Sequence, residues 1–345
     1  MNRDHVSNGS WRRWLPWLGA FLGAAALAWA LRQFDLDRFR ATIVNADPRF
    51  ILILPIVIVA EQVVRGWKWH QFLWHLRPVS TLYLFGAIMS GYLLAMLVPF
   101  GFGTVARSWL VARREGLDLT AVLATVALDR VTDGVVFVCL IPVALLLVAF
   151  PDPGGIRSGF IWGGIGTAMF FVLVLLGLIW YRRQALQPAT WLTLLVDRLP
   201  ARLAAPVRRL AASFAEGINW PQGFWRGGAI ILAGIAIKLL AATQFFWAGL
   251  AFGVVLHPAE YLFVMLFIGF LVILGHFARI AGSFIVGALF VLSLLGVPKE
   301  QALPMALIVE VSNLLSVAGI GALALWVQGI ALSQLRAEIR SHSVA

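Results

Sequence analysis

The chain alternates between long apolar stretches and short segments rich in basic residues, glycine or proline. Several of these stretches run for about twenty residues with almost no charge, the length that a helix needs to cross a hydrocarbon core about 30 Å thick. We therefore predict an all-α, polytopic membrane protein with about eight hydrophobic segments, of which about six are full spans and two are broken-helix pairs. The predicted full spans are residues 15–31, 50–64, 119–150, 160–181, 227–255 and 305–327.

Proline and glycine mark the two broken pairs. The first pair covers residues 82–109 and the second covers residues 261–295. Non-helical backbone at membrane depth survives only where it is buried in protein or lines a wet cavity. We predict that both pairs are re-entrant and enter from opposite faces, as in an inverted repeat. The residues assigned to the breaks are Pro99, Gly101 and Gly103 in the first pair, and Gly275 and Gly282 in the second.

The distribution of charge predicts the domain organisation. Residues 1–181 form a first membrane repeat, 182–226 a basic amphipathic linker on the cytoplasmic surface, 227–330 a second repeat and 331–345 a cytoplasmic tail. Basic residues flank the first span and the tail, so the positive-inside rule predicts cytoplasmic N- and C-termini. We expect the first span to be retained, because a signal peptide would need cleavage after an unusually long apolar region.

Composition supports a membrane protein and removes other classes. Hydrophobic residues make up 61% of the chain and charged residues 12%, against roughly a quarter charged in a soluble domain. The net charge of +11 matches anionic lipid headgroups better than nucleic acid, because the basic residues flank apolar runs. Cys139 is the single cysteine, so no intrachain disulfide forms. Common metal and nucleotide motifs are lacking, so we expect no metal and no cofactor.

Charged residues inside the apolar stretches are the candidate site. A charge at the bilayer centre costs about 2.5–3.5 kcal/mol, so each needs a partner or a function. Asp129 and Asp133 share a helix face, and Arg130 lies three positions before Asp133 and can pair with it. One interpretation is a headgroup or proton site in which Arg130 holds a lipid phosphate. The other is a structural ion-pair cluster between helices, and the sequence does not choose between them.

Other charged residues accompany the breaks. Arg107 follows the first break, where free backbone N–H groups and a helix N-terminus can help it to bind a phosphodiester. Arg279 and His276 lie in the second break, and Glu310 is isolated in an apolar run as a candidate for proton coupling.

Three further cations fall at or within apolar runs. Arg65 and Lys68 end a predicted span among tryptophans, which indicates snorkelling to the membrane surface. Lys238 is isolated in an apolar run, where we expect it to pair with an acid elsewhere in the chain.

An ordered set of motifs resembles the lysylphosphatidylglycerol synthase transmembrane region family, which includes the flippase half of bacterial multiple peptide resistance factors and stand-alone flippase-like proteins. The motifs are Arg65-Gly-Trp-Lys-Trp-His-Gln-Phe-Leu, Pro99-Phe-Gly-Phe-Gly-Thr-Val-Ala-Arg107, Arg113-Arg-Glu-Gly and Ala127-Leu-Asp-Arg-Val-Thr-Asp133. The resemblance covers nearly the whole chain and implies lipid translocation, without a soluble aminoacyl-transferase domain. Thr104 and Asp129 depart from the pattern, because the family often has an acidic residue at the first position and Glu at the second.

These observations predict a transporter that moves a phospholipid, glycolipid or hopanoid-type lipid between leaflets of a bacterial inner membrane. The expected partners are membrane lipids, either an anionic phospholipid or a lipid-linked substrate, with an envelope-lipid biosynthetic enzyme as a further candidate. One alternative is a membrane-embedded glycosyltransferase that uses a polyprenyl-phosphate sugar, with Asp35 and Asp37 as its acids. Another is a scaffold whose charges are purely structural.

Overall fold

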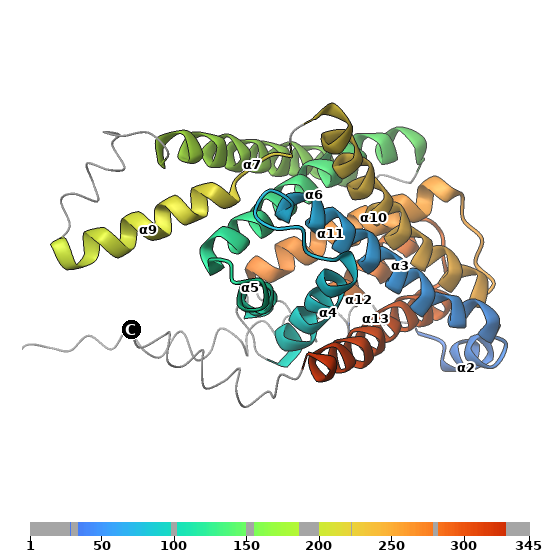
Figure 1. Cartoon of the computed structure of the whole chain (residues 1–345). Coiled ribbons are helices and arrows are strands. Elements are labelled where there is room, and N and C mark those ends of the chain that lie inside the picture. Colours follow the sequence, from blue (N-terminus) through green and yellow to red (C-terminus); the bar gives the residue numbers. More distant parts are fainter. Residues whose placement is uncertain are drawn as a thin grey trace, which may run out of the picture. The chain divides into compact units, whose positions relative to one another are not determined.

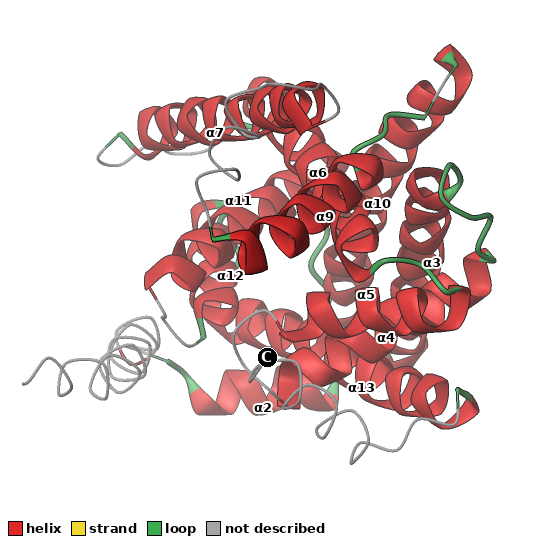
Figure 2. Ribbon diagram, turned by 60° about the vertical axis from the view of Figure 1, so that its left-hand side comes forward, coloured by secondary structure: helices red, strands yellow, loops and turns green. Residues whose placement is uncertain are grey.

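The computed structural model describes Ala28 and residues 34–97, 102–149, 155–185, 200–221, 223–278 and 282–328. This part of the chain is almost entirely helical and contains no strand (Figure 2), so the predicted all-α class is confirmed. The helices, labelled in Figure 1, are α2 (Leu36–Val44), α3 (Pro48–Leu73), α4 (Thr81–Leu97), α5 (Phe102–Glu115), α6 (Leu119–Leu147), α7 (Ile156–Ala185), α9 (Ala201–Gly217), α10 (Phe224–Ala251), α11 (Pro258–Ala278), α12 (Ser283–Leu294) and α13 (Lys299–Val327).

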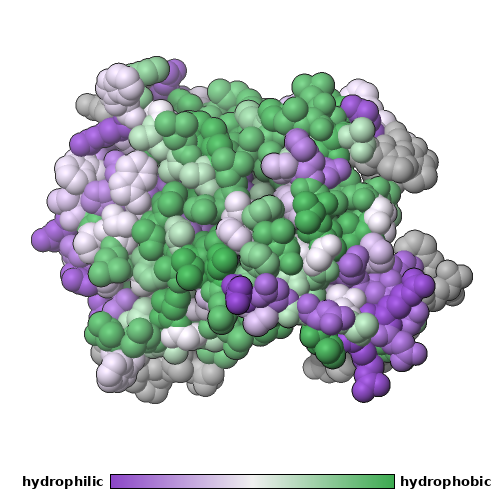
Figure 3. All heavy atoms as spheres, turned by 90° about the vertical axis from the view of Figure 1, so that its right-hand side faces the viewer, coloured by the Kyte–Doolittle hydropathy of each residue, from purple (hydrophilic) through white to green (hydrophobic). Residues whose placement is uncertain are grey.

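Five of the described helices are long and apolar enough to cross a membrane, namely α3, α6, α7, α10 and α13. They coincide with five of the six predicted spans, while the remaining one, residues 15–31, lies outside the described residues apart from Ala28. Hydrophobic side chains cover much of the face in Figure 3. On α7 only 6% of the most apolar stretch is buried. Such surfaces suit contact with lipid, and the chain is a polytopic helical membrane protein.

The described chain divides into two compact units, each assembled from several parts of the sequence. The α4 unit comprises Val57–Cys139, Gly159–Leu240 and Asn313–Ala345, and the α11 unit comprises Met1–Ile56, Leu140–Ser158 and Ala241–Ser312. Each unit contains one of the two predicted broken-helix pairs. The division of the sequence into two repeats stays a prediction, as does entry from opposite faces.

The first broken pair, α4 and α5, is a tight helical hairpin. The Tyr83 hydroxyl near the start of α4 donates to the carbonyl of Leu110 near the end of α5 at 2.9 Å. A Cβ on Gly103 would lie 2.3 Å from the Gly91 carbonyl oxygen, so the two backbones touch. Small residues permit such close helix contact. At 17 and 14 residues, the helices extend only about 25 and 21 Å, less than a hydrocarbon core.

The second broken pair, α11 and α12, forms a hairpin in the α11 unit. The rings of Phe267 and Phe290 stack with centroids 5.7 Å apart. Gly282, with φ +76°, precedes α12 in the left-handed region that glycine tolerates. Gly275 was predicted to break the helix, but α11 continues through it to Ala278. One glycine costs a helix interior only about 1 kcal/mol, too little to end it.

The second predicted span is longer than its sequence suggests. Residues 50–64 were expected to end at Arg65, yet α3 continues through Arg65 and Lys68 to Leu73. Both cations are buried in the α4 unit. They have partners inside the protein, so they do not mark a membrane surface, and the snorkelling interpretation is wrong.

The predicted linker contains the amphipathic helix α9. Arg208 and Arg209 are exposed, whereas Ser213 and Ala215 near its C-terminal end are buried. The Tyr181 hydroxyl at the end of α7 donates to the Ala211 carbonyl at 3.0 Å. The predicted amphipathic helix is therefore present, and it packs on α7 through its second half.

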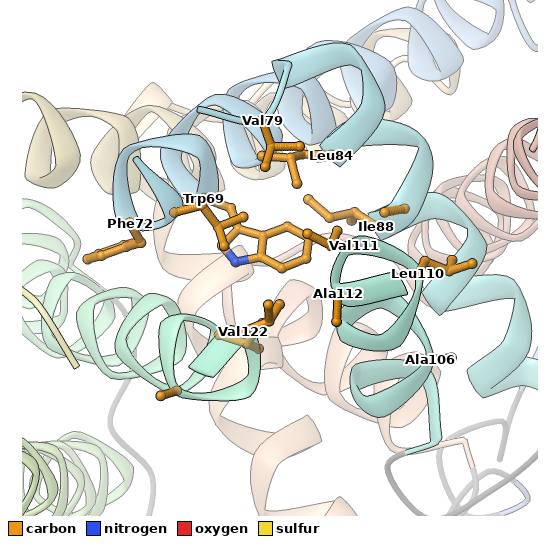
Figure 4. Close-up of a cluster of buried hydrophobic side chains, with 14 of the residues drawn as sticks. Trp69, Phe72, Val79, Leu84, Ile88, Ala106, Leu110, Val111, Ala112 and Val122 are labelled. Atoms are coloured by element: carbon orange, nitrogen blue, oxygen red, sulfur yellow. The ribbon is translucent and has the colours of Figure 1, made fainter. Parts of the chain in front are cut away.

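The core of the α4 unit surrounds Trp69 of α3. In Figure 4 its indole lies among side chains of α4, α5 and α6, including Ile88, Val111 and Val122. The indole N–H donates to the Thr125 hydroxyl of α6 at 3.0 Å. Trp69 is only 1% exposed, so this core joins α3, the α4–α5 hairpin and α6, the helices that carry the charged residues.

The close contact within the α4–α5 hairpin predicts that Gly103→Ala reduces the free energy of unfolding by about 1–3 kcal/mol, because overpacking forces the backbones apart. Gly166→Ala on α7 is the control, since its added Cβ would meet nothing within 4 Å. That change should be neutral or slightly stabilising, because alanine favours a helix by up to about 1 kcal/mol. Thermal unfolding in detergent measures both, and equal midpoints would contradict the contact.

Candidate functional site

Buried ion pairs join α3 to α6 inside the α4 unit. The Lys68 Nζ lies 2.5 Å from Asp133 Oδ1 and 3.1 Å from Asp129 Oδ1. Arg65 Nη1 donates to Asp133 Oδ2 at 2.8 Å. The Lys68 side chain is fully buried and that of Asp129 is 1% exposed, so these contacts form in a low-dielectric interior where charge attraction is strong.

Glu61 and Lys238 complete what we call the ion cluster, defined as Glu61, Arg65, Lys68, Asp129, Asp133 and Lys238. Arg65 Nη2 donates to Glu61 Oε1 at 3.0 Å, one helical turn away on α3. Lys238 of α10 lies within electrostatic range of Asp133, and its Nζ sits 5.7 Å from the centre of the Phe137 ring. The cluster thus contains three bases and three acids, and its formal charges cancel.

Arg107 of α5 is buried without a hydrogen-bond acceptor among the described residues. Its side chain is 2% exposed, yet Nε, Nη1 and Nη2 all lack a partner there. Its Cζ lies 5.1 Å from the centre of the Trp69 ring, so the guanidinium packs on the indole. A cation–π contact of about 2 kcal/mol offsets only part of the desolvation cost of a buried charge. The five N–H donors and the positive charge of Arg107 therefore have no hydrogen-bond acceptor among the described residues.

Arg130 and Tyr92 lie beside Arg107. Arg107 is within electrostatic range of both, and the Tyr92 hydroxyl is within hydrogen-bonding reach of the Arg130 side chain. Arg130 is exposed, whereas its neighbours Asp129 and Val131 are buried. Tyr92 therefore has a buried and an exposed arginine near it.

The expected pair between Arg130 and Asp133 does not form. Asp133 is paired with Arg65 and Lys68 instead, and no ion pair joins it to Arg130 within the described ranges. The sequence reasoning also missed Arg65 and Lys68 as site residues. Their spacing of three puts both on one face of α3, a signal that matches the i, i+4 spacing of Asp129 and Asp133 on α6.

The structure brings together four of the predicted headgroup residues, since Arg107, Asp129, Arg130 and Asp133 all belong to the α4 unit. Glu310 is exposed on α13 in the α11 unit. Other predicted positions lie outside what the structure describes, namely Pro99, Gly101, Arg279 and the side chain of His276.

Asp35, proposed as a catalytic acid in the glycosyltransferase alternative, has a structural role. Its Oδ1 accepts from the backbone N–H groups of Asp37 and Arg38, both at 3.0 Å, and caps α2. Its Oδ2 lies 3.3 Å from Arg38 Nε. Within the part of the chain that the structure describes, no three His, Cys, Asp or Glu side chains are placed to hold a metal ion. Helix capping thus accounts for the position of Asp35 at the start of α2.

The ion cluster predicts that Lys68→Met lowers the free energy of unfolding by about 3–5 kcal/mol, because a buried acid is left without its cation. Asp129→Asn in the same chain should recover part of that loss by removing the stranded charge. Arg77→Met is the control, since Arg77 is exposed and contacts Glu115 through an ion pair at 3.5 Å and a hydrogen bond to its carbonyl. This change should cost only about 1 kcal/mol. Equal effects of the two methionine variants on thermal unfolding would show that the cluster does not stabilise the fold.

Comparison with known proteins places the chain in a family. A family model described as lysylphosphatidylglycerol synthase TM region matches residues 17–321, a range that includes Arg107 and the whole ion cluster. No curated protein and no solved structure matches the chain. The resemblance carried by the motifs is confirmed, and since the match covers most of the sequence, this chain belongs to the lysylphosphatidylglycerol synthase transmembrane region family.

Proposed function

We propose that this protein moves a lipid with a phosphate-bearing headgroup between the leaflets of a bacterial inner membrane, and that Arg107 binds the phosphate. The observation that carries the proposal is the buried Arg107 guanidinium, whose three nitrogens lack an acceptor among the described residues. Membership of a lipid-related membrane family supports the same class of substrate.

The energetics of Arg107 favour a ligand. Burying an unpaired charge costs several kcal/mol, and a bound counter-ion offsets that cost. The planar guanidinium fork matches the oxygens of a phosphate in a bidentate way. A phosphate that leaves the membrane surface also loses its hydration and needs a counter-charge. Arg107 supplies a positive charge to the phosphate, and the phosphate supplies a negative charge to Arg107.

Charge balance indicates an anionic headgroup. The ion cluster is formally neutral, so Arg107 and Arg130 leave the site with a formal charge of +2 among the described residues. This positive charge attracts an anionic headgroup and repels a headgroup that carries an additional amino group. We therefore propose an anionic phospholipid or lipid phosphate as the substrate, in preference to a cationic aminoacyl lipid.

The accessible side of the site suggests how a headgroup enters. Arg130 is exposed, Tyr92 is half-buried and Arg107 is buried. In our proposal the phosphate first meets Arg130 and then passes the Tyr92 hydroxyl to reach Arg107. The acyl chains stay in the bilayer, because only the headgroup needs a polar environment.

A purely structural interpretation explains the ion cluster but not Arg107. The pairs between α3 and α6 join two helices and need no ligand. The Arg107 side chain, by contrast, forms no hydrogen bond with another described residue. If the role of Arg107 were structural, replacing it should lower the stability of the fold. If its role is to bind a ligand, replacing it should not, so a measurement of stability distinguishes the structural interpretation from the binding interpretation.

The proposal predicts opposite effects of Arg107→Met on transport and on stability. Leaflet exchange of fluorescent phosphatidylglycerol in proteoliposomes should fall about 10- to 100-fold, because charge-assisted hydrogen bonds to the phosphate are lost. The midpoint of thermal unfolding should rise, since replacing a buried charge with an apolar side chain often stabilises by about 1–4 kcal/mol.

Arg113→Met is the matched control, because Arg113 is an exposed arginine on the same helix. It should leave exchange close to that of the unmodified protein. Arg107→Lys should keep part of the activity, since it retains the charge but loses the bidentate fork. Unchanged exchange in Arg107→Met, or a fall in exchange together with a lower unfolding midpoint, would overturn the assignment of Arg107 as the phosphate ligand.

A further inference from the structure

A second candidate site lies in the α4 unit away from Arg107. It is a groove of about 560 Å³ between α6, α7 and the segment that follows α9. Its walls are almost entirely apolar and come from Leu128, Leu175, Ile179, Ile218 and Trp220. Apart from the Trp220 indole N–H, these side chains offer no hydrogen-bonding group, so the walls suit a hydrocarbon chain.

The groove borders α7, the least buried of the five described candidate spans. Only 6% of the most apolar stretch of α7 is buried, and Leu173 and Leu176 on either side of the groove residue Leu175 are 63% and 56% exposed. Trp220 is 40% exposed at the opposite wall, and tryptophan is typical of the membrane interface. The space is therefore next to the surface where acyl chains lie.

Two arginines complete the lining. Arg182 and Arg183 occupy the last turn of α7, directly after the apolar stretch. Arg182 is half-buried and Arg183 is exposed. Neither forms an ion pair with a described acid. Basic residues at the end of an apolar helix lie at headgroup level, where each attracts an anionic lipid.

We propose that this groove binds one acyl chain of an anionic phospholipid, with Arg182 and Arg183 on its phosphate. The apolar walls match the acyl chain of such a lipid, and the two arginines match its phosphate. A free phosphate would leave the apolar walls without a hydrocarbon to contact. The bound lipid is not the transported one, and it fills the space that α7 leaves against α6 and the segment after α9.

The test is photolabelling of the full chain in nanodiscs with phosphatidylglycerol that carries a diazirine on one acyl chain. Mass spectrometry should locate adducts on peptides that contain Leu175, Ile179 and Trp220. Arg182→Gln/Arg183→Gln should reduce these adducts about tenfold, because two charge contacts to the phosphate are lost. Diazirine phosphatidylcholine at the same mole fraction should label the same peptides far less.

Arg208→Gln/Arg209→Gln is the matched control, because it also removes two adjacent arginines, both exposed on α9, and neither lines the groove. Labelling of the groove should be unchanged in this variant. Ile179→Trp should fill the groove and abolish the adducts without a change of charge. Equal labelling by the two lipids, or labelling that is unaffected by the loss of Arg182 and Arg183, would overturn the proposal and indicate annular lipid only.

Discussion

The buried ion pairs between α3 and α6 are the interaction on which the α4 unit depends. Lipid offers helices no hydrophobic reason to associate, so packing and polar contacts must hold them together. Lys68 bridges Asp129 and Asp133, and Arg65 pairs with Asp133 from one turn earlier. These contacts fix how α3 and α6 are placed along each other. The same register puts Trp69 against Thr125, and the indole in turn supports Arg107.

The ion cluster and Arg107 are two opposite solutions to the same constraint. In the cluster the formal charges of acids and bases cancel inside the protein through ion pairs between α3 and α6. Arg107 forms no hydrogen bond with a described residue, and Asp129 attracts it only through space, so much of the cost of burying its charge is not offset. Proteins keep such unfavourable features where function needs them, because stability and binding compete for the same groups. The contrast between the paired charges of the cluster and the unpaired donors of Arg107 is the reason for proposing Arg107 as the phosphate ligand.

The sequence predicted the helices well but the contacts between their charged residues poorly, because the paired residues lie far apart along the chain. Apolar length is a local property, so five spans and the hairpin around Gly103 could be read directly. Arg65 pairs with Asp133, 68 positions away, and nothing near Arg65 separates such a partner from a membrane surface. The local pair of Arg130 with Asp133 was predicted because it was close in sequence, although the acid had stronger partners on α3.

Gly103 shows why the hairpin matters to the site. It was assigned to a helix break, but its observed role is contact, since a Cβ there would lie 2.3 Å from the Gly91 carbonyl oxygen and a Cβ on Gly91 would lie 2.9 Å from the Arg107 Cβ. Helices that touch through their backbones slide or separate only at the cost of that packing. We therefore expect α4 and α5 to move as one body in any conformational change, so that the exposure of Arg107 depends on the position of the hairpin against α3 and α6.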